Sequence, residues 1–360
     1  MGKEHPFDDL LQEDLNHIAA NFPLADDLRG KTVLVTGATG LIGSQIVRAL
    51  LGMNRLKKTE IKVIAFVRSQ EKAEKVFGGL LKQGELELAV GDINQPITLD
   101  GGVDYIIHGA SATSSQYFVS HPVETIFTAI DGTRHVLELA AQKRVSGFVY
   151  LSSLEVYGTP AADVGLIDEA YSGYLDPLQV RSSYSEGKRM AECLCAGFAS
   201  EYAVPVKVAR LSQTFGPGVA YRDGRVFAEF ARCAIEGRDI VLHTAGNTVR
   251  SYCYTRDAVN ALLYILLRGK PGQAYNVTNM DTAVSIREMA QLVCGLVPEQ
   301  GIQLRFDTPE NLASFGYNPE MVIRLDSRKL QSLGWQAEVG LEEMFRRLIG
   351  SMQSARNGKF

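Results

Sequence analysis

Short apolar runs alternate with amphipathic stretches over the first two-thirds of the chain. Helical spacing of apolar residues predicts helices directly after the first run, at about 122–143 and at about 182–202. Strands that alternate with helices in this way are typical of a parallel, doubly wound sheet, so we expect an α/β fold. The apolar runs predict six strands: one that begins at Lys31, and others at 61–67, 86–90, 103–110, 147–153 and 204–211.

The pattern changes after Leu211. A glycine-rich loop is followed by a helical stretch near 225–236 and by shorter apolar segments. We expect residues 31–212 to form the sheet domain and residues 213–360 to form mainly a smaller α/β lobe, with about 239–278 returning to the larger domain.

A helical pattern also precedes the first strand, within residues 1–30. It predicts an amphipathic helix that packs on the body of the protein or on a second subunit. This extension carries no recognisable chemistry. The apolar positions of the pattern are Leu10, Leu11, Leu15, Ile18 and Ala19.

Composition and charge exclude several classes of protein. The 360 residues include 37 Lys and Arg against 41 Asp and Glu, a formal net charge of −4, and 46% are hydrophobic. This balance argues against a protein that coats nucleic acid. No apolar run approaches the ~18 residues that a membrane helix needs. The acidic N-terminal stretch lacks the apolar core of a signal peptide, so we expect a cytoplasmic location.

The cysteines and histidines show no spacing typical of a metal site. Five cysteines make an odd count without a CxxC pair, which favours reduced thiols that serve as small core residues. The six histidines are scattered, so we expect no metal site. The cysteines are Cys193, Cys195, Cys233, Cys253 and Cys294.

A glycine-rich turn between the first strand and the first long helix indicates a dinucleotide site. Gly37, Gly40 and Gly43 form a GxxGxxG pattern at the start of the helix. Glycines here permit a tight turn and let backbone N–H groups approach a pyrophosphate at the helix N-terminus. The pattern therefore predicts a Rossmann domain that binds a dinucleotide, NAD or NADP.

The end of the second strand leaves the choice between NAD and NADP open. An acid that would hold the adenosine ribose is usual there, but this strand ends in Val67-Arg68-Ser69. Arg68 could stack on adenine or meet the 2′-phosphate of NADP, or it could be a solvated loop residue. Asp92, just after the third strand, could accept a hydrogen bond from the adenine amino group or simply form a turn.

Tyr184 and Lys188 lie four residues apart in a predicted helix, so they share a face. An ammonium group beside a phenol is expected to lower the pKa of the phenol, giving a general acid/base near neutral pH. Ser153 ends a predicted buried strand and could hydrogen-bond the same substrate hydroxyl. These three residues form a candidate catalytic set.

Five segments in order resemble the extended branch of the short-chain dehydrogenase/reductase superfamily. They are TGATGLIG, LSSLEVYG, YSEGK, RLSQTFGPG and VRSYCYTRDAV, and the resemblance runs from Lys31 to about Gly350. It implies an NAD-dependent enzyme that acts on a nucleotide-diphosphate sugar through a 4-keto intermediate. In such an enzyme Tyr184 would take the proton of the sugar 4-hydroxyl, Lys188 would hold the nicotinamide ribose, and Ser153 would orient the reacting oxygen.

The resemblance also implies contacts with both ligands and a homodimer formed through two helices of each subunit. Gln213 and Ala129 stand where the family usually carries Asn, and the change at Ala129 removes a side-chain bond near the active site. The expected substrate contacts are Ser111, Gln213, Arg225 and Arg250. The expected cofactor contacts are Gly37, Thr39, Gly40, Leu41, Ile42, Gly43, Arg68, Asp92, Ile93, Ala110, Tyr184 and Lys188.

Glu155 discriminates between reactions within the family. It lies two residues beyond Ser153, which places both on the same side if the segment is extended. The 4,6-dehydratases carry an adjacent Asp–Glu pair here, whereas this chain has Leu154 before Glu155. Residues 153–158 and 181–189 resemble the UDP-glucuronate decarboxylases more closely, and simple 4-epimerases usually lack the Glu. A loop carboxylate without a catalytic role is the alternative for Glu155.

Three functions follow from these observations. The first is a UDP-glucuronate decarboxylase, with a nucleotide-sugar 4,6-dehydratase or 4-epimerase as the alternative. The second is an NADPH-dependent keto-sugar reductase, suggested by Arg68. The third is a non-catalytic dinucleotide sensor of the same fold, which the intact Ser153, Tyr184 and Lys188 argue against.

Overall fold

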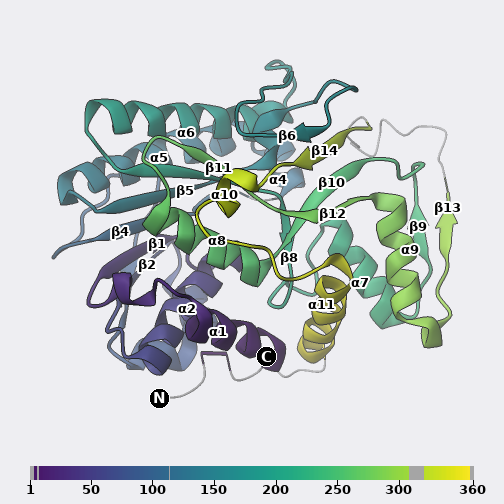
Figure 1. The fold of residues 1–360 in the computed structure, drawn as a ribbon, viewed down its shortest axis with the longest axis horizontal. Helices are drawn as coiled ribbons and strands as arrows, with labels where there is room; N and C mark the ends of the chain where they lie inside the picture. The colour runs from purple at the N-terminus through teal and green to yellow at the C-terminus, as the bar shows by residue number, and fades with distance from the viewer. Residues whose placement is uncertain (1–3, 6–7, 113, 308–319, 357–360) are drawn as a thin grey trace.

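A parallel sheet of seven strands forms the centre of the larger part of the molecule (Figure 1). The computed structural model describes residues 4–5, 8–112, 114–307 and 320–356. The strands lie in the order β11-β7-β5-β4-β1-β2-β3, and each neighbouring pair is parallel. They are β1 (Thr32–Thr36), β2 (Lys62–Val67), β3 (Leu86–Val90), β4 (Tyr105–His108), β5 (Gly147–Ser153), β7 (Val206–Leu211) and β11 (Ala274–Val277).

Helices cover both faces of this sheet, and each face has its own apolar core (Figure 1). On one face lie α1 (Asp9–Asn21), α2 (Leu41–Lys57) and α8 (Thr255–Arg268); on the other lie α5 (Pro122–Lys143) and α6 (Ser182–Glu201). Successive residues of β1 divide between the two cores, because strand side chains alternate. Val33 and Val35 belong to the first core, whereas Leu34 belongs to the second. The expected doubly wound α/β fold is confirmed.

A smaller part of the molecule is built on a sheet of five strands. Its path is β12-β10-β14-β6, and β8 pairs with β10. Helices α7 (Val226–Glu236), α9 (Ile286–Leu296) and α11 (Leu341–Arg356) pack in a third apolar core. The strands are β6 (Leu166–Ile167), β8 (Gln213–Phe215), β10 (Val249–Tyr254), β12 (Asn279–Ser285) and β14 (Val322–Leu325), and β9 (Ile240–Leu242) pairs with β13 (Leu304–Phe306) in a sheet of two.

The remaining helices are short. They are α3 (Gln70–Phe77), α4 (Ser115–Ser120) and α10 (Arg328–Gln331), with 3-10 turns η1 (Ala25–Leu28), η2 (Gly78–Lys82), η3 (Leu154–Tyr157) and η4 (Pro298–Gln300).

The segment 239–278 divides between the two parts. β9 and β10 lie in the smaller sheets, whereas β11 pairs with β7 at the edge of the large sheet. Helix α8, which follows β10 and precedes β11 in the chain, packs against β5 and β7 of the large sheet. The chain therefore crosses between the two parts more than once, and the division at residues 212 and 213 stays a prediction.

The N-terminal helix α1 is fixed to the body of the protein by a buried polar cluster. The Asp14 carboxylate accepts hydrogen bonds from Tyr254 Oη (2.5 Å) and from Arg347 Nη2 (3.2 Å) of α11. Asp8 caps α1 and accepts a hydrogen bond from Ser351 Oγ (2.5 Å), also of α11. Burial raises the pKa of Asp14 to about 6, against the effect of its partners. Of the two placements expected for this helix, packing on the body is the one observed.

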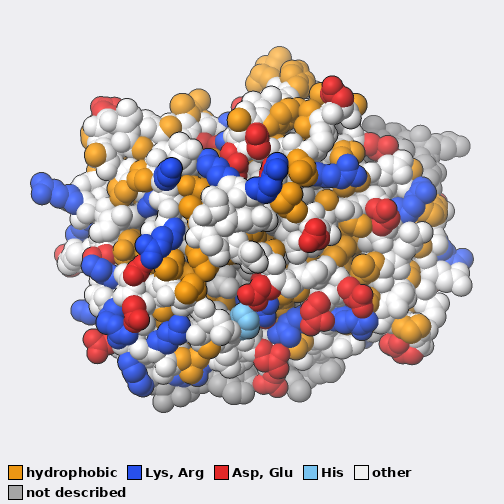
Figure 2. Space-filling model, viewed as in Figure 1, with side chains coloured by type: hydrophobic (Ala, Val, Ile, Leu, Met, Phe, Trp, Pro, Cys, Tyr) orange, Lys and Arg blue, Asp and Glu red, His pale blue; other side chains and the backbone are white. Residues whose placement is uncertain are grey.

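The surface and the cysteines refine the picture from composition. Basic and acidic side chains are interspersed on the face shown in Figure 2. No helix within the described residues is long and apolar enough to cross a membrane. All five cysteines are free, but the expectation that each is a core residue is wrong for Cys193, which is exposed on α6.

Candidate active site

The carboxyl ends of β1, β4, β5 and β7 meet at one edge of the large sheet. Because β2 and β3 lie on one side of β1 and β4 to β11 lie on the other, the strand order reverses beside β1. Open α/β sheets bind ligands in the crevice at such a point. The glycine turn follows β1, and Ser153 ends β5, so the predicted cofactor and catalytic residues lie along this edge.

The glycine turn has the shape of a pyrophosphate cradle. Gly37 has a φ of +67°, and a Cβ there would lie 2.7 Å from the carbonyl carbon of Gly109. A Cβ on Gly43 would lie 2.8 Å from the carbonyl carbon of Gly37. Gly40 is the N-cap residue of the 17-residue helix α2, and within the described residues no side chain bonds the N–H groups of the first turn. These N–H groups, from Leu41 onward, can therefore face an anion. The residues present fit a dinucleotide.

A buried hydrogen-bond chain supports the end of β4 beside this cradle. The His108 ring contacts Thr36 Oγ1 through Nδ1 (2.6 Å) and Thr133 Oγ1 through Nε2 (3.1 Å). Burial, assisted by the nearby Lys188 charge, lowers the pKa of His108 to about 3. Ala110 N–H donates to Thr36 Oγ1 (3.2 Å). His108 is therefore a neutral, satisfied residue that shapes the backbone at Ala110.

The residues expected near adenine lie at the ends of β2 and β3. Arg68 is exposed directly after β2. Asp92 is also exposed, and its Oδ1 accepts a hydrogen bond from Asn94 N–H (3.0 Å), which closes a turn. The Ile93 carbonyl oxygen contacts His135 Nδ1 (3.1 Å). Asp92 therefore forms the turn that was one of its two expected roles. The other role, a hydrogen bond from adenine to its second carboxylate oxygen, stays a prediction.

Tyr184 lies beside Ser153 and under an aromatic neighbour. Its ring stacks on Phe118 of α4, with centroids 4.2 Å apart and 10° between the planes. Burial raises the pKa of Tyr184 above its ordinary value of 10, and the Glu155 charge acts in the same direction. The side-chain hydrogen bond with Ser153 opposes this rise. The phenol is therefore held in its protonated form.

Lys188 is bonded to a backbone carbonyl group of β5. It is 3% exposed, and Nζ donates a hydrogen bond to the Leu151 carbonyl oxygen (2.7 Å). Nζ lies 4.7 Å from the ring centroid of Tyr150, but 5.9 Å from that of Tyr184. The expectation that Lys188 lowers the pKa of Tyr184 is thus wrong for this structure, because Lys188 is engaged elsewhere and burial dominates.

The Glu155 carboxylate is held by hydrogen bonds to two side chains and is not a solvated loop residue. Arg181 Nη2 donates to Oε1 (2.9 Å), and Ser185 Oγ donates to Oε2 (3.1 Å). The expectation of an extended segment is wrong, because residues 154–157 form the 3-10 turn η3. Ser153 Oγ accepts a hydrogen bond from Glu155 N–H (3.3 Å) and caps this turn. The cap is what brings Glu155 over α6, where its charge acts on Tyr184.

The expected substrate residues approach this edge from the smaller part. In the strand register Ser153 is opposite Leu211 of β7, and Gln213 of β8 is opposite Tyr252 of β10. Arg250 lies two residues before Tyr252, and its Nη2 contacts Met321 Sδ (3.6 Å). Gln213 therefore lies where the chain passes from β7, the neighbour of the strand that ends in Ser153, to β8, which pairs with the strand that carries Arg250.

Two further expected substrate residues have local partners. Arg225 caps α7, and its guanidinium pairs with Asp223 (2.7 Å) and lies over Phe227, with Cζ 4.7 Å from the ring centroid. Ser111, after β4, donates to the Ala112 carbonyl oxygen (3.1 Å). Neither contact brings these side chains to Tyr184.

Comparison with known proteins decides the family. Residues 33–278 match the model of the NAD dependent epimerase/dehydratase family. The chain belongs to this family.

Two curated relatives agree with the family match. UDP-glucuronic acid decarboxylase 6 of Arabidopsis thaliana is 32% identical over 313 residues, which cover 86% of this chain and 85% of the relative. UDP-glucuronic acid decarboxylase 1 of Xenopus tropicalis is 32% identical over 323 residues, 89% of this chain and 71% of the relative. A crystal structure of UDP-glucose 4-epimerase from Thermotoga maritima has the same fold, with a TM-score of 0.75 at 21% identity over 90% of this chain and 99% of that one.

Membership of the epimerase/dehydratase family confirms the resemblance inferred from the sequence and the expectation of an NAD-dependent enzyme. Several residues of this family member were missed from sequence. Phe118 covers Tyr184, Tyr150 faces Lys188, and Glu192 follows Lys188 by four residues. Only Glu192 carries a signal that the chain alone offers, namely an acid at helical spacing from Lys188.

Within the described residues no group of three or more His, Cys, Asp or Glu side chains could hold a metal ion.

Proposed function

We propose that the chain is an NAD-dependent UDP-glucuronic acid decarboxylase. The observation that carries this proposal is the placement of Glu155 beside Tyr184, fixed by Arg181 and Ser185. Leu154 stands where the 4,6-dehydratases carry an acid, so the chain lacks their acid–base pair. The two decarboxylases that are 32% identical over most of their length support the same reaction.

The first step is oxidation at carbon 4 of the sugar. Tyr184 takes the proton of the 4-hydroxyl as hydride leaves carbon 4. Ser153 hydrogen-bonds the reacting oxygen, and Lys188 would hold the nicotinamide ribose. When bound, the oxidised nicotinamide supplies the hydride acceptor and a positive charge that lowers the pKa of a neighbouring phenol. This charge opposes the burial that raises the pKa of Tyr184.

The second step follows from the chemistry of the oxidised sugar. With a ketone at carbon 4 and a carboxylate on carbon 5, the sugar is a β-keto acid. The bond between carbons 5 and 6 breaks, carbon dioxide leaves, and the electron pair moves to the carbon 4 oxygen, which Tyr184 and Ser153 stabilise. A proton from solvent, relayed by Glu155, is then added to carbon 5, and the electron pair returns from the oxygen to restore the ketone at carbon 4. Tyr184 finally gives its proton back to the carbon 4 oxygen, as carbon 4 would take back hydride from the reduced cofactor.

The cofactor residues expected from sequence stand as proposals on this geometry. The cradle residues Gly37, Thr39, Gly40, Leu41, Ile42 and Gly43 bind the pyrophosphate, and Ile93 and Ala110 border the rest of the dinucleotide. We favour NAD over NADP, although the exposed Arg68 after β2 suits a 2′-phosphate as well as an adenine ring.

For the substrate, we propose that Arg250 grips the diphosphate with its planar fork. Ser111, Gln213 and Arg225 contribute further contacts from the two sides of the crevice. The lobe formed mainly by residues 213–360 then covers the sugar nucleotide, while residues 31–212 hold the dinucleotide.

We also propose that the enzyme works as a cytoplasmic homodimer. Apolar side chains project from the outer face of α5: Val123 is 56% exposed and Phe127 is 54% exposed. Met190 of the adjacent helix α6 is 53% exposed. Such a two-helix apolar face suits a second copy of itself related by a twofold axis. The five free cysteines suit a reducing compartment.

Product mass tests the reaction. Purified protein is incubated separately with UDP-glucuronate, dTDP-glucose and UDP-glucose, with the Tyr184→Phe variant as the control for adventitious activity. Loss of carbon dioxide from UDP-glucuronate supports the proposal. Loss of water from dTDP-glucose indicates a dehydratase, and an isomer of unchanged mass indicates an epimerase. UDP-glucuronate that returns unaltered while another sugar is converted refutes the decarboxylase.

A net NADPH-dependent reductase is the second candidate, and exposed Arg68 favours it. It predicts that reduced nicotinamide is consumed in proportion to product. Turnover of UDP-glucuronate without added reduced cofactor excludes it.

A further inference from the structure

Glu192 joins three elements that carry the active site. It lies on α6, and its side chain is 13% exposed. Ser152 Oγ of β5 donates to Oε1 (2.5 Å). Arg210 of β7 donates through Nε to Oε1 (3.0 Å) and through Nη2 to Oε2 (2.6 Å). One largely buried carboxylate therefore ties α6 to the ends of β5 and β7.

These contacts fix the strand end that presents Ser153. Ser152 and Arg210 are opposite one another in the register of β5 and β7, and the next pair is Ser153 and Leu211. Both serines contact side chains of α6: Ser152 bonds Glu192, and the next residue, Ser153, bonds Tyr184. A displacement at Glu192 is thus transmitted to Ser153 and to the helix of Tyr184 together.

Glu192 also supplies negative charge near Lys188, one helical turn away. Burial lowers the pKa of Lys188 to about 8, and Glu192 acts in the opposite direction. His108 is neutral, and burial raises the pKa of the Cys195 thiol, so neither side chain is charged at neutral pH. The titratable groups around Lys188 are Tyr184, Glu192 and Cys195 of α6, Tyr150 of β5 and His108 of β4.

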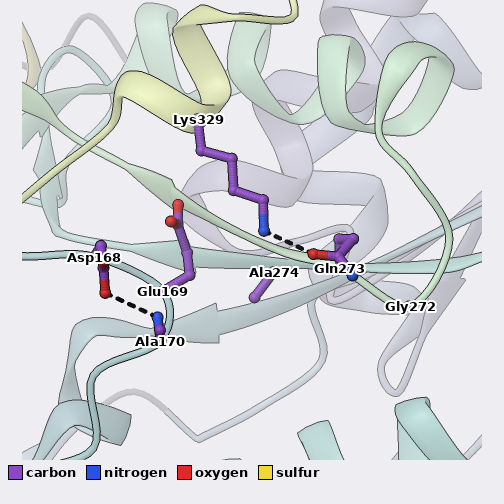
Figure 3. A pocket seen from close by; sticks show the side chains of 7 residues that line it. All are labelled: Asp168, Glu169, Ala170, Gly272, Gln273, Ala274 and Lys329. Atoms are coloured by element: carbon purple, nitrogen blue, oxygen red, sulfur yellow. Dashed lines mark hydrogen bonds between the residues drawn. The ribbon is translucent and has the colours of Figure 1, made fainter.

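Arg210 is itself fixed at its outer side. Its Nη1 donates to Tyr157 Oη (3.1 Å) and to the Glu169 carbonyl oxygen (2.9 Å), and Tyr157 Oη donates to Asn276 Oδ1 (2.6 Å). Glu169 lines a cavity of about 400 Å³ beside β11, shown in Figure 3. The contacts with Tyr157 and Glu169 therefore hold the Arg210 guanidinium in position independently of Glu192.

We propose that Glu192 is a positioning residue of the active site, which aligns Ser153 with Tyr184 and provides a counter-charge to Lys188. This role rests on the proposed function only in its kinetic consequence. Its structural consequence, the charge state of Lys188, is measurable without any substrate.

The direct test is NMR titration of the lysine side chains in uniformly lysine-labelled full-length protein. The Lys188 signal is assigned by its loss in the Lys188→Arg variant. In Glu192→Gln we expect the titration midpoint of Lys188 to fall by about one pH unit or more, as for removal of a nearby opposite charge. Glu186→Gln is the matched control, because Glu186 is an acid of the same helix that pairs with Arg189 (3.7 Å). An unchanged midpoint in Glu192→Gln overturns the proposal.

Kinetics test the alignment separately. In Glu192→Gln the alkaline limb of the kcat profile moves to lower pH by the same amount as the Lys188 midpoint, whereas Glu186→Gln keeps the wild-type profile. Ser152→Ala removes one hydrogen bond without a change of charge, so kcat falls about tenfold or more while the Lys188 midpoint stays in place.

The variants also separate the possible failures. If Glu192→Gln does not fold, Ser152→Ala decides, and a wild-type kcat there overturns the proposal. If wild-type protein converts no UDP-glucuronate, the proposed function fails, and the NMR midpoint still decides the role of Glu192.

Discussion

Replacing Gly43 with alanine tests the cradle most sharply. The Cβ of Gly43→Ala would lie 2.8 Å from the Gly37 carbonyl carbon and 3.0 Å from Ala38 Cα. Carbon atoms in van der Waals contact are about 3.5–4.0 Å apart. The turn after β1 and the first turn of α2 must therefore separate by more than half an ångström, and backbone atoms form both sides of the contact.

Two losses follow from this separation. Overpacking of this kind costs about 1–3 kcal/mol of unfolding free energy. The N–H groups at the start of α2 also move relative to the turn, and a misplacement approaching 1 Å costs about 10²-fold in a positioned interaction. We therefore expect NAD affinity to fall by about 10²-fold, beyond what the loss of stability explains.

The assay compares Gly43→Ala with Gly295→Ala. Gly295 lies in α9, and a Cβ at this position would have no neighbouring atom within 4 Å, so the same substitution there should stabilise the protein by about 0.5–1 kcal/mol. Urea unfolding gives the stability of each variant, and calorimetric titration gives its NAD affinity. Wild-type NAD affinity in Gly43→Ala would refute the assignment of this turn as the cradle.

Three further predictions concern the substrate, the pH dependence and the dimer. Arg250→Lys loses the planar fork, so KM for the nucleotide sugar rises about tenfold or more while kcat changes little in steady-state assays. His108 is neutral when folded and has a pKa of about 3 against 6.5 when unfolded, so its contribution to stability is present above pH 6.5 and is lost as the pH falls toward 3. It steepens the fall in unfolding free energy by about 1.4 kcal/mol per pH unit, and His108→Asn should flatten that slope in urea titrations; an unchanged slope contradicts a buried neutral histidine. Phe127→Glu should convert a dimer to a monomer in sedimentation experiments, whereas Leu56→Glu, on α2, should not; a monomeric wild type contradicts the proposed interface.

The strands and long helices could be predicted because their apolar patterns are strong. The strands at 86–90 and 147–153 and the helix at 122–143 begin and end where the sequence predicts. The apolar residues of such elements face a core whatever the distant parts of the chain do. The family and its NAD dependence were also accessible, because five motifs occur in the family's order.

The electrostatics of the site could not be predicted in the same way. Spacing puts Tyr184 and Lys188 on one face of α6, but the pKa of Tyr184 depends on burial and on η3, which brings Glu155 near. Likewise, Arg210 of β7 donates a hydrogen bond to Glu192 of α6, a contact between two different elements. Contacts of this kind depend on tertiary packing, which local spacing does not record. The contacts expected with cofactor and substrate stay predictions for the same reason.

The attachment of α1 to α11 has a consequence for synthesis of the chain. The Asp14 carboxylate is buried against Tyr254 and Arg347, and Arg347 belongs to a helix made more than three hundred residues later. Until that helix emerges from the ribosome, docking α1 would bury a carboxylate with only one of its two arginine partners, Arg256, in place, which is costly. The first helix of the nascent chain should therefore be among the last to dock, and ribosome-stalled chains that end before α11 should leave it open to proteases and chaperones.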